Sequence, residues 1–140
     1  MSFITIEYGF ADESRRPLNT MSHTDATVAV QEFPWEEQLA LFNHGHDRVG
    51  PEVCFIRRTT KEQEEPEDVE AYASIAKVED GTWLIVAGSR MPGLFLWLFP
   101  TTKVTDIIMD SIAWQDVQRF IQRFYQDSRA DLFAWMKEHG

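Results

Sequence analysis

The residues best suited to metal binding in this sequence are two histidines and a cysteine. His44 and His46 flank Gly45, and Cys54 follows shortly afterwards. Imidazole and thiolate are common zinc ligands, but a zinc site needs three or four ligands, and their spacing here matches no established pattern. His44 followed by Gly45 is also typical of the polar C-terminal end of a helix. We therefore expect no metal and no cofactor. His44 and His46 are the residues that would bind a metal if there were one.

Neighbouring carboxylates offer a second type of chemistry, general acid–base catalysis. Such catalysis needs two carboxyl groups held in different environments within a cleft. The pairs here fall in expected loops, in turns and at a solvent-facing helix start, where ordinary solvated charge explains them. Cys54 lies between apolar residues of an expected strand, which favours an inert thiol over a nucleophile. The sequence therefore predicts a protein that is not an enzyme. The carboxylate pairs are Glu36–Glu37, Glu64–Glu65, Glu67–Asp68 and Glu79–Asp80.

The densest run of charge suggests protein binding. Residues 62–70 carry six carboxylates within nine positions. That density would attract a basic groove on another protein and raise the association rate, although solubility alone explains it equally well. The candidate partner-binding residues in this run are Glu62, Glu64, Glu65, Glu67, Asp68 and Glu70.

Overall charge and composition exclude several classes of function. The chain of 140 residues has a formal net charge of −10 and a pI near 4.7, so it repels nucleic acid and anionic membranes. A single cysteine excludes an intrachain disulfide and favours a reducing compartment. The N-terminal residues lack the features of a signal peptide, and the longest apolar run, Leu94–Phe99, is far shorter than the ~20 residues of a membrane helix. We expect one cytoplasmic domain spanning residues 1–140.

A hairpin and a following strand over residues 69–99 are expected to form the centre of the fold. Asp80–Gly81 lies between two β-rich runs, which predicts a two-residue turn. That turn would pair Val78 with Trp83 and would make the hairpin apolar on both faces. The six apolar residues before Pro100 then read as a third buried strand.

Two amphipathic helices are expected to pack against this sheet. In the first, over residues 34–44, Trp35, Leu39 and Phe42 recur on one face. The second covers residues 112–126. Residues 11–26 and 60–68 are expected to be polar loops, and residues 131–137 fit either a strand or a helix. The sequence thus predicts an α+β fold with a mostly antiparallel sheet of about five strands and two helices.

The order of these elements resembles the small α+β immunity proteins of bacterial polymorphic-toxin, contact-dependent and type VI secretion systems. The residues that carry the resemblance are Ile112–Val117, Arg119–Phe124 and Asp131–Trp135. The resemblance implies a C-terminal strand that bears tryptophan. It also implies a cytoplasmic, non-enzymatic protein that binds a cognate toxin and blocks its active site or substrate groove, and the acidic balance agrees with a partner whose groove is basic. Under this resemblance the carboxylates of residues 62–70 would steer the toxin, and Glu79 and Asp80 at the expected hairpin turn would be a second contact.

Two other classes of function remain open at this stage. A secretion chaperone or adaptor for an effector is also small and acidic, and would bind an extended segment at a sheet edge, although its usual element order begins with a helix. A small ligand-binding domain or enzyme would need an apolar cavity with convergent polar groups.

Overall fold

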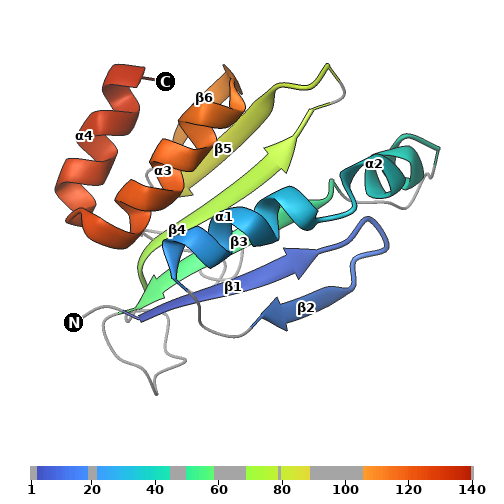
Figure 1. The fold of residues 1–140 in the computed structure, drawn as a ribbon, viewed down its shortest axis with the longest axis horizontal. Helices are drawn as coiled ribbons and strands as arrows, with labels where there is room; N and C mark the ends of the chain where they lie inside the picture. The colour runs from blue at the N-terminus through green and yellow to red at the C-terminus, as the bar shows by residue number, and fades with distance from the viewer. Residues whose placement is uncertain are drawn as a thin grey trace, which may run out of the picture.

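The computed structural model describes residues 3–18, 22–44, 50–58, 69–78, 80–88 and 106–139. Within these ranges the chain forms a six-stranded antiparallel sheet and four helices, which confirms the α+β class and adds one strand and two helices to the expectation (Figure 1). The strand order is β2-β1-β3-β4-β5-β6. In chain order the elements are β1 (Phe3–Gly9), β2 (Arg15–Leu18), α1 (His23–Glu32), α2 (Trp35–His44), β3 (Glu52–Arg58), β4 (Val69–Lys77), β5 (Trp83–Gly88), β6 (Asp106–Ile112), α3 (Trp114–Gln126) and α4 (Arg129–His139).

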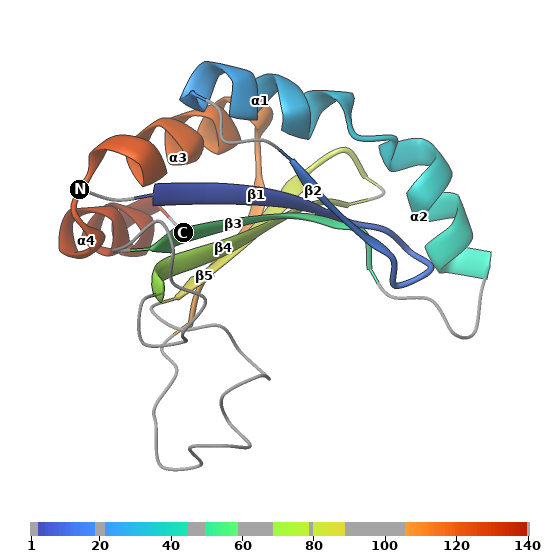
Figure 2. The ribbon, with the colours of Figure 1, turned by 90° about the horizontal axis from the view of Figure 1, so that it is seen from below.

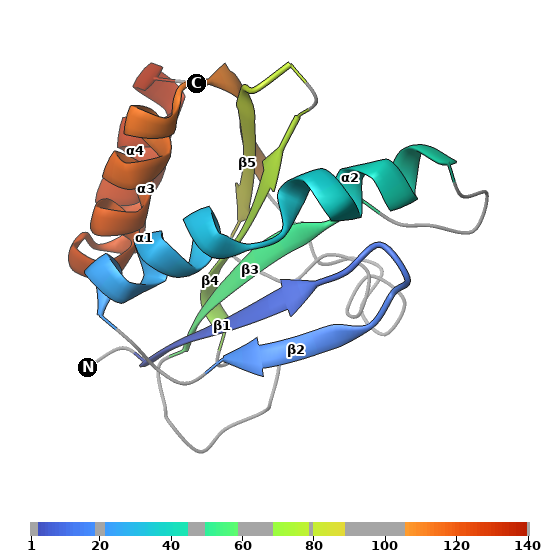
Figure 3. The ribbon, with the colours of Figure 1, turned by 45° about the vertical axis from the view of Figure 1, so that its right-hand side comes forward.

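The helices divide the two faces of the sheet into a covered and an open face. Side chains alternate between faces along a strand, and one set of positions, including Ile6, Phe55 and Ile85, is fully buried. α1 and α3 lie across this covered face, and α4 packs beside α3 and against β6 (Figure 2). No described helix lies on the opposite face, which we call the open face. α2 extends to the end of the sheet farther from α3 and α4 (Figure 3).

The two expected helices are present, but they bury their apolar residues to different degrees. In α3, Val117, Ile121 and Phe124 are fully buried, as the spacing predicts. In α2, Trp35 is buried, whereas Phe42 leaves 40% of its surface exposed. None of the helices in the described ranges is both long and apolar enough to cross a membrane.

The central hairpin has a different register from the predicted one. Lys77, not Val78, lies opposite Trp83, so every pair is shifted by one residue. Gly81 has φ +88° and its N–H donates to the Val78 carbonyl at 3.0 Å, which makes the connection a three-residue loop. Three-residue hairpins of this kind place glycine in the left-handed region at their last position. The predicted two-residue turn is therefore wrong. Because side chains alternate along a strand, the shift of one residue places the opposite set of β4 side chains on the same face as Trp83.

The prediction of a loop at residues 11–26 is wrong. It contains β2, which pairs with β1, and the first turn of α1. Ser22 caps α1 by accepting a hydrogen bond from the Asp25 N–H at 3.2 Å. The buried positions of α1 include the small side chains of Ala26 and Ala29, so its apolar stripe is weak in the sequence.

The C-terminal segment is a helix. Ser128 accepts a hydrogen bond from the Asp131 N–H at 3.1 Å, and Leu132, Trp135 and Met136 of α4 are buried. The tryptophan-bearing strand implied by the resemblance is thus replaced by a helix. The strand expected at Leu94–Phe99 and the loop at residues 60–68 lie outside the described residues.

A buried arginine ties α3 to the sheet. Arg57 points from β3 to the covered face and is only 2% exposed. Its Nη1 donates to the carbonyls of Phe124 at 2.8 Å and Asp127 at 2.9 Å, and its Nε lies 3.3 Å from Oε2 of Glu70. The last carbonyls of a helix lack partners within the helix and carry partial negative charge. Arg57 therefore supplies both the donors and the charge that the end of α3 requires.

Replacing this arginine is expected to destabilise the fold. Arg57→Ala should lower the free energy of unfolding by about 3 kcal/mol, because it leaves buried carbonyls and a carboxylate without their partner. Urea denaturation measures the loss. The control is Arg119→Ala, which removes an exposed ion pair to Asp116 and should cost less than about 0.5 kcal/mol. Equal losses in the two variants would contradict the assigned role.

Candidate functional site

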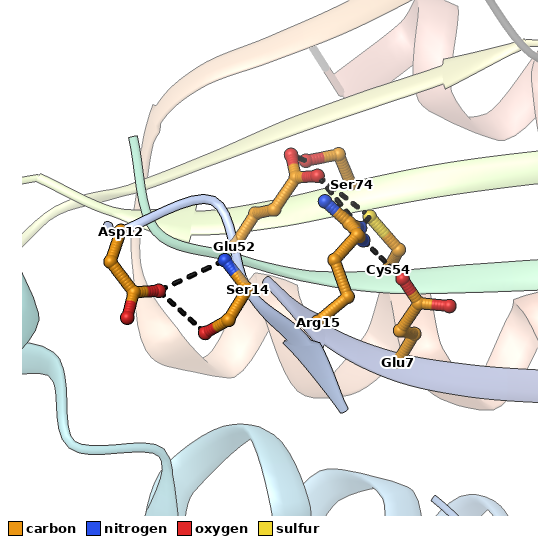
Figure 4. Close-up of polar contacts among 7 residues, drawn as sticks. All are labelled: Glu7, Asp12, Ser14, Arg15, Glu52, Cys54 and Ser74. Atoms are coloured by element: carbon orange, nitrogen blue, oxygen red, sulfur yellow. Dashed lines mark hydrogen bonds and ion pairs between the residues drawn. The ribbon is translucent and has the colours of Figure 1, made fainter. Parts of the chain in front are cut away.

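Four neighbouring strands bring a polar cluster together on the open face (Figure 4). Glu7 of β1 lies opposite Cys54 of β3, which in turn lies opposite Ser74 of β4. Arg15 reaches the same place from β2, and Glu52 lies two residues before Cys54 on the same side of β3. Of these residues only Cys54 stands out as a candidate in the sequence, because each strand contributes only one or two of them and no local spacing links them.

Arg15 holds the cluster together. Its Nε pairs with Oε1 of Glu7, and its Nη2 lies 3.2 Å from Oε1 of Glu52 and 3.0 Å from Sγ of Cys54. To reach β3 the guanidinium must cross β1, and it does so over Gly9. A Cβ at Gly9 would lie 2.9 Å from Nη1 of Arg15, which is closer than real Cβ atoms come, and 3.1 Å from Cγ of Glu52, which is tighter than most Cβ contacts. Glycine at position 9 therefore allows the Arg15 side chain to cross β1 and reach β3.

Glu52 is held as a carboxylate. Its Oε1 accepts from Sγ of Cys54 at 2.9 Å and its Oε2 accepts from Oγ of Ser74 at 2.6 Å. Burial raises the pKa of Glu52, but the hydrogen bonds from Cys54, Ser74 and Arg15 outweigh it, and the pKa falls below its ordinary value. Both oxygens are engaged inside the cluster.

Cys54 is held as a thiol. Burial raises its pKa, and the negative charge and hydrogen bond of Glu52 raise it further, more than Arg15 lowers it. The thiolate is the form that attacks electrophiles and binds metals, so this thiol is poorly suited to either role. In the described ranges no group of three or more His, Cys, Asp and Glu residues is placed to hold a metal ion. His46 and the side chain of His44 lie outside those ranges.

The polar cluster divides a groove that runs along the open face. One hollow of about 400 Å³ is lined by Glu7, Cys54, Ile56 and Tyr72, and it shares Arg15, Glu52 and Ser74 with a second hollow of about 620 Å³.

Towards α2, the second hollow shares Gly50, Pro51, Ala76 and Leu84 with a third of about 280 Å³. That third hollow ends at Leu39 and Phe42 of α2 and at Val78 beyond β4. The three hollows therefore adjoin and form one groove.

Exposed apolar side chains mark the α2 end of this groove. Phe42 is 40% exposed and Val78 is 36% exposed, and both line the third hollow. Exposed carboxylates accompany them, because Glu36 and Glu37 lie one to two turns earlier on α2. Residues 22–44 contain no Lys or Arg at all. The sequence signal for the α2 side of this surface is the absence of Lys and Arg from residues 22–44, together with an aromatic residue at the end of the apolar stripe. Lys77 of β4 also lines the third hollow, from the side of the sheet.

Two of the predicted partner-binding residues are described. The carboxylate of Glu70 pairs with the buried Arg57, so it helps to hold α3 in place. Asp80 is exposed at the tip of the central hairpin, where it accepts hydrogen bonds from the side chain and the N–H of Thr82, and these lower its pKa. The remaining six, Glu62, Glu64, Glu65, Glu67, Asp68 and Glu79, lie outside the described residues.

Comparison with known proteins finds no relative: no family model, no curated protein sequence and no solved structure matches this chain.

The thiol of Cys54 is expected to react slowly. At pH 8 its alkylation by iodoacetamide should be at least about tenfold slower in the folded chain than in the urea-unfolded chain, because little thiolate forms. Glu52→Gln should speed the reaction by removing the adjacent negative charge, and Glu36→Gln on α2 serves as the control for a carboxylate outside the cluster. The rates are read by mass spectrometry. Folded Cys54 that reacts as fast as the unfolded thiol would contradict the assignment.

Proposed function

We propose that this protein holds another protein in the groove of its open sheet face, and that it acts as an immunity protein which neutralises a cognate bacterial toxin. The observation that carries the proposal is the groove itself. It combines apolar walls, a polar cluster at its middle and an exposed aromatic residue at one end. Its lining residues come from the five strands β1 to β5 and from α2, and a surface spread over so many elements suits a segment of a protein partner.

Phe42 is proposed as the anchor of the interface. Interfaces concentrate their binding energy in a few aromatic and arginine side chains that are surrounded by less important contacts. Phe42 is the exposed aromatic residue of α2, and its apolar neighbour Val78 comes from the central hairpin. A pair of apolar residues from two separate elements offers a small, preformed patch on which a partner side chain can pack.

Charge supports a basic partner. The net charge is −10, and Glu36 and Glu37 are exposed on the same helix as the proposed anchor. Carboxylates around an interface steer a positively charged partner toward it and raise the association rate. A toxin that acts on nucleic acid has a basic groove of this kind. In this proposal the carboxylates of residues 62–68 contribute to the same steering, whereas Glu70 pairs with Arg57.

The chemistry of the polar cluster favours binding over catalysis. A catalytic nucleophile requires an activated thiolate or hydroxyl beside a base. In this cluster the base, Glu52, stabilises the protonated form of Cys54 and has its oxygens engaged by hydrogen bonds. The cluster is thus arranged to fix side chains in place, which suits a recognition surface.

The test is complex formation with the product of the neighbouring gene. The wild-type chain should co-purify with it and bind it more slowly as salt is raised, because exposed charges are screened. Phe42→Ala should weaken binding by about 30-fold, the effect of losing an aromatic anchor. Surface plasmon resonance measures the association rate and the dissociation rate separately. Glu36→Gln with Glu37→Gln should lower the association rate and its salt dependence.

The matched control for Phe42 is Val28, which is 43% exposed on α1 and does not line the groove. Val28→Ala should leave the affinity within about twofold of wild type. A complex that forms equally well with Phe42→Ala and Val28→Ala would refute the groove as the interface. Failure to form any complex would refute the proposed function.

A further inference from the structure

We propose that the 400 Å³ hollow beside the polar cluster receives an arginine side chain of the protein partner. This inference rests on the proposed function and deepens it, because it names the residue type that the end of the groove farther from α2 recognises. Three observations support it: the charge balance of the cluster, an unused carboxylate oxygen at the rim and the apolar walls.

The charge balance of the hollow favours a cation. Two carboxylates, Glu7 and Glu52, line it together with one guanidinium, Arg15, which leaves a formal charge of −1. The thiol of Cys54 adds no charge, because burial and Glu52 keep its pKa high. One further positive charge would make the group neutral, whereas an anion would meet two carboxylates. Opposite charges in a partly desolvated site attract more strongly than on the open surface.

Glu7 is the acceptor that a partner can reach. Its side chain is 33% exposed, and Arg15 engages its Oε1. Its Oε2 has no hydrogen-bond partner among the described residues. Glu52, by contrast, accepts from Cys54 and Arg15 at one oxygen and from Ser74 at the other. A guanidinium presents a planar set of donors that suits a carboxylate, so the free edge of Glu7 is its natural contact.

The walls of the hollow suit the rest of an arginine side chain. Ile56 and Tyr72 line it from β3 and β4. Arginine packs its methylene groups along apolar surface and stacks its guanidinium on aromatic rings. The hollow is also preformed, because the strand pairing of β1, β3 and β4 sets its floor and Arg15 is fixed across Gly9. A preformed site loses less entropy on binding.

The experiment is a titration of the full chain, followed by NMR, with N-acetyl-arginine amide. N-acetyl-citrulline amide, which has nearly the same shape and no charge, and N-acetyl-lysine amide are the comparison probes, at matched ionic strength. The signals of Ile56 and Ser74 should shift with the arginine probe, and citrulline should bind at least about fivefold more weakly, as expected for loss of a charge-assisted contact. Glu7→Gln should weaken arginine binding by a similar factor, and Glu138→Gln on α4 should leave it unchanged.

Citrulline binding as tight as arginine, or shifts that survive Glu7→Gln, would overturn the assignment. Tighter binding of the lysine probe would overturn it too, since the site would then select an ammonium group. If Glu7→Gln does not fold, the comparison of arginine with citrulline on the wild-type chain decides alone. The titration uses no partner protein, so it is independent of the test of complex formation. If the arginine probe does not bind but the complex forms and depends on Phe42, only the arginine site is rejected. If no complex forms, the proposed function is rejected.

Discussion

The rest of the structure depends on the burial of one face of the sheet by helices. Large apolar residues such as Ile6, Phe55 and Ile85 alternate to the same side of their strands, and α1 and α3 pack over them. Arg57 joins this layer as a buried cation, held by the carbonyls at the end of α3 and by Glu70. Since the helices bury that face, the opposite face carries the mixed side chains from which a recognition surface can form.

The strand register then determines what that surface contains. Antiparallel pairing places Glu7, Cys54 and Ser74 side by side, although they are far apart in the sequence. A long arginine from β2 spans the remaining distance because Gly9 offers no side chain in its path. Hydrogen bonds from three directions keep Glu52 ionised, and Glu52 in turn keeps Cys54 protonated. The cluster is therefore a fixed set of charges beside an apolar groove.

Sequence patterns predicted the elements whose periodicity is strong. The helices at residues 34–44 and 112–126 were found because large apolar residues recur at helical spacing. α1 was missed because small alanines form much of its buried stripe, and β2 because it depends on pairing with β1. The hairpin register failed by one residue because Gly81 closes a three-residue loop. The polar cluster could not be predicted from the sequence, because only strand pairing brings its residues together.

The most direct test of the open face as a binding surface is NMR of a methyl-labelled chain in complex with the product of the neighbouring gene. The methyl groups of Ile56, Leu84 and Val86, which line the groove, should shift strongly on binding. Those of Ile6, Ile75 and Ile85, which are buried beneath the helices, should stay close to their free positions. Shifts confined to α3 and α4, with the groove methyl groups unchanged, would contradict the account.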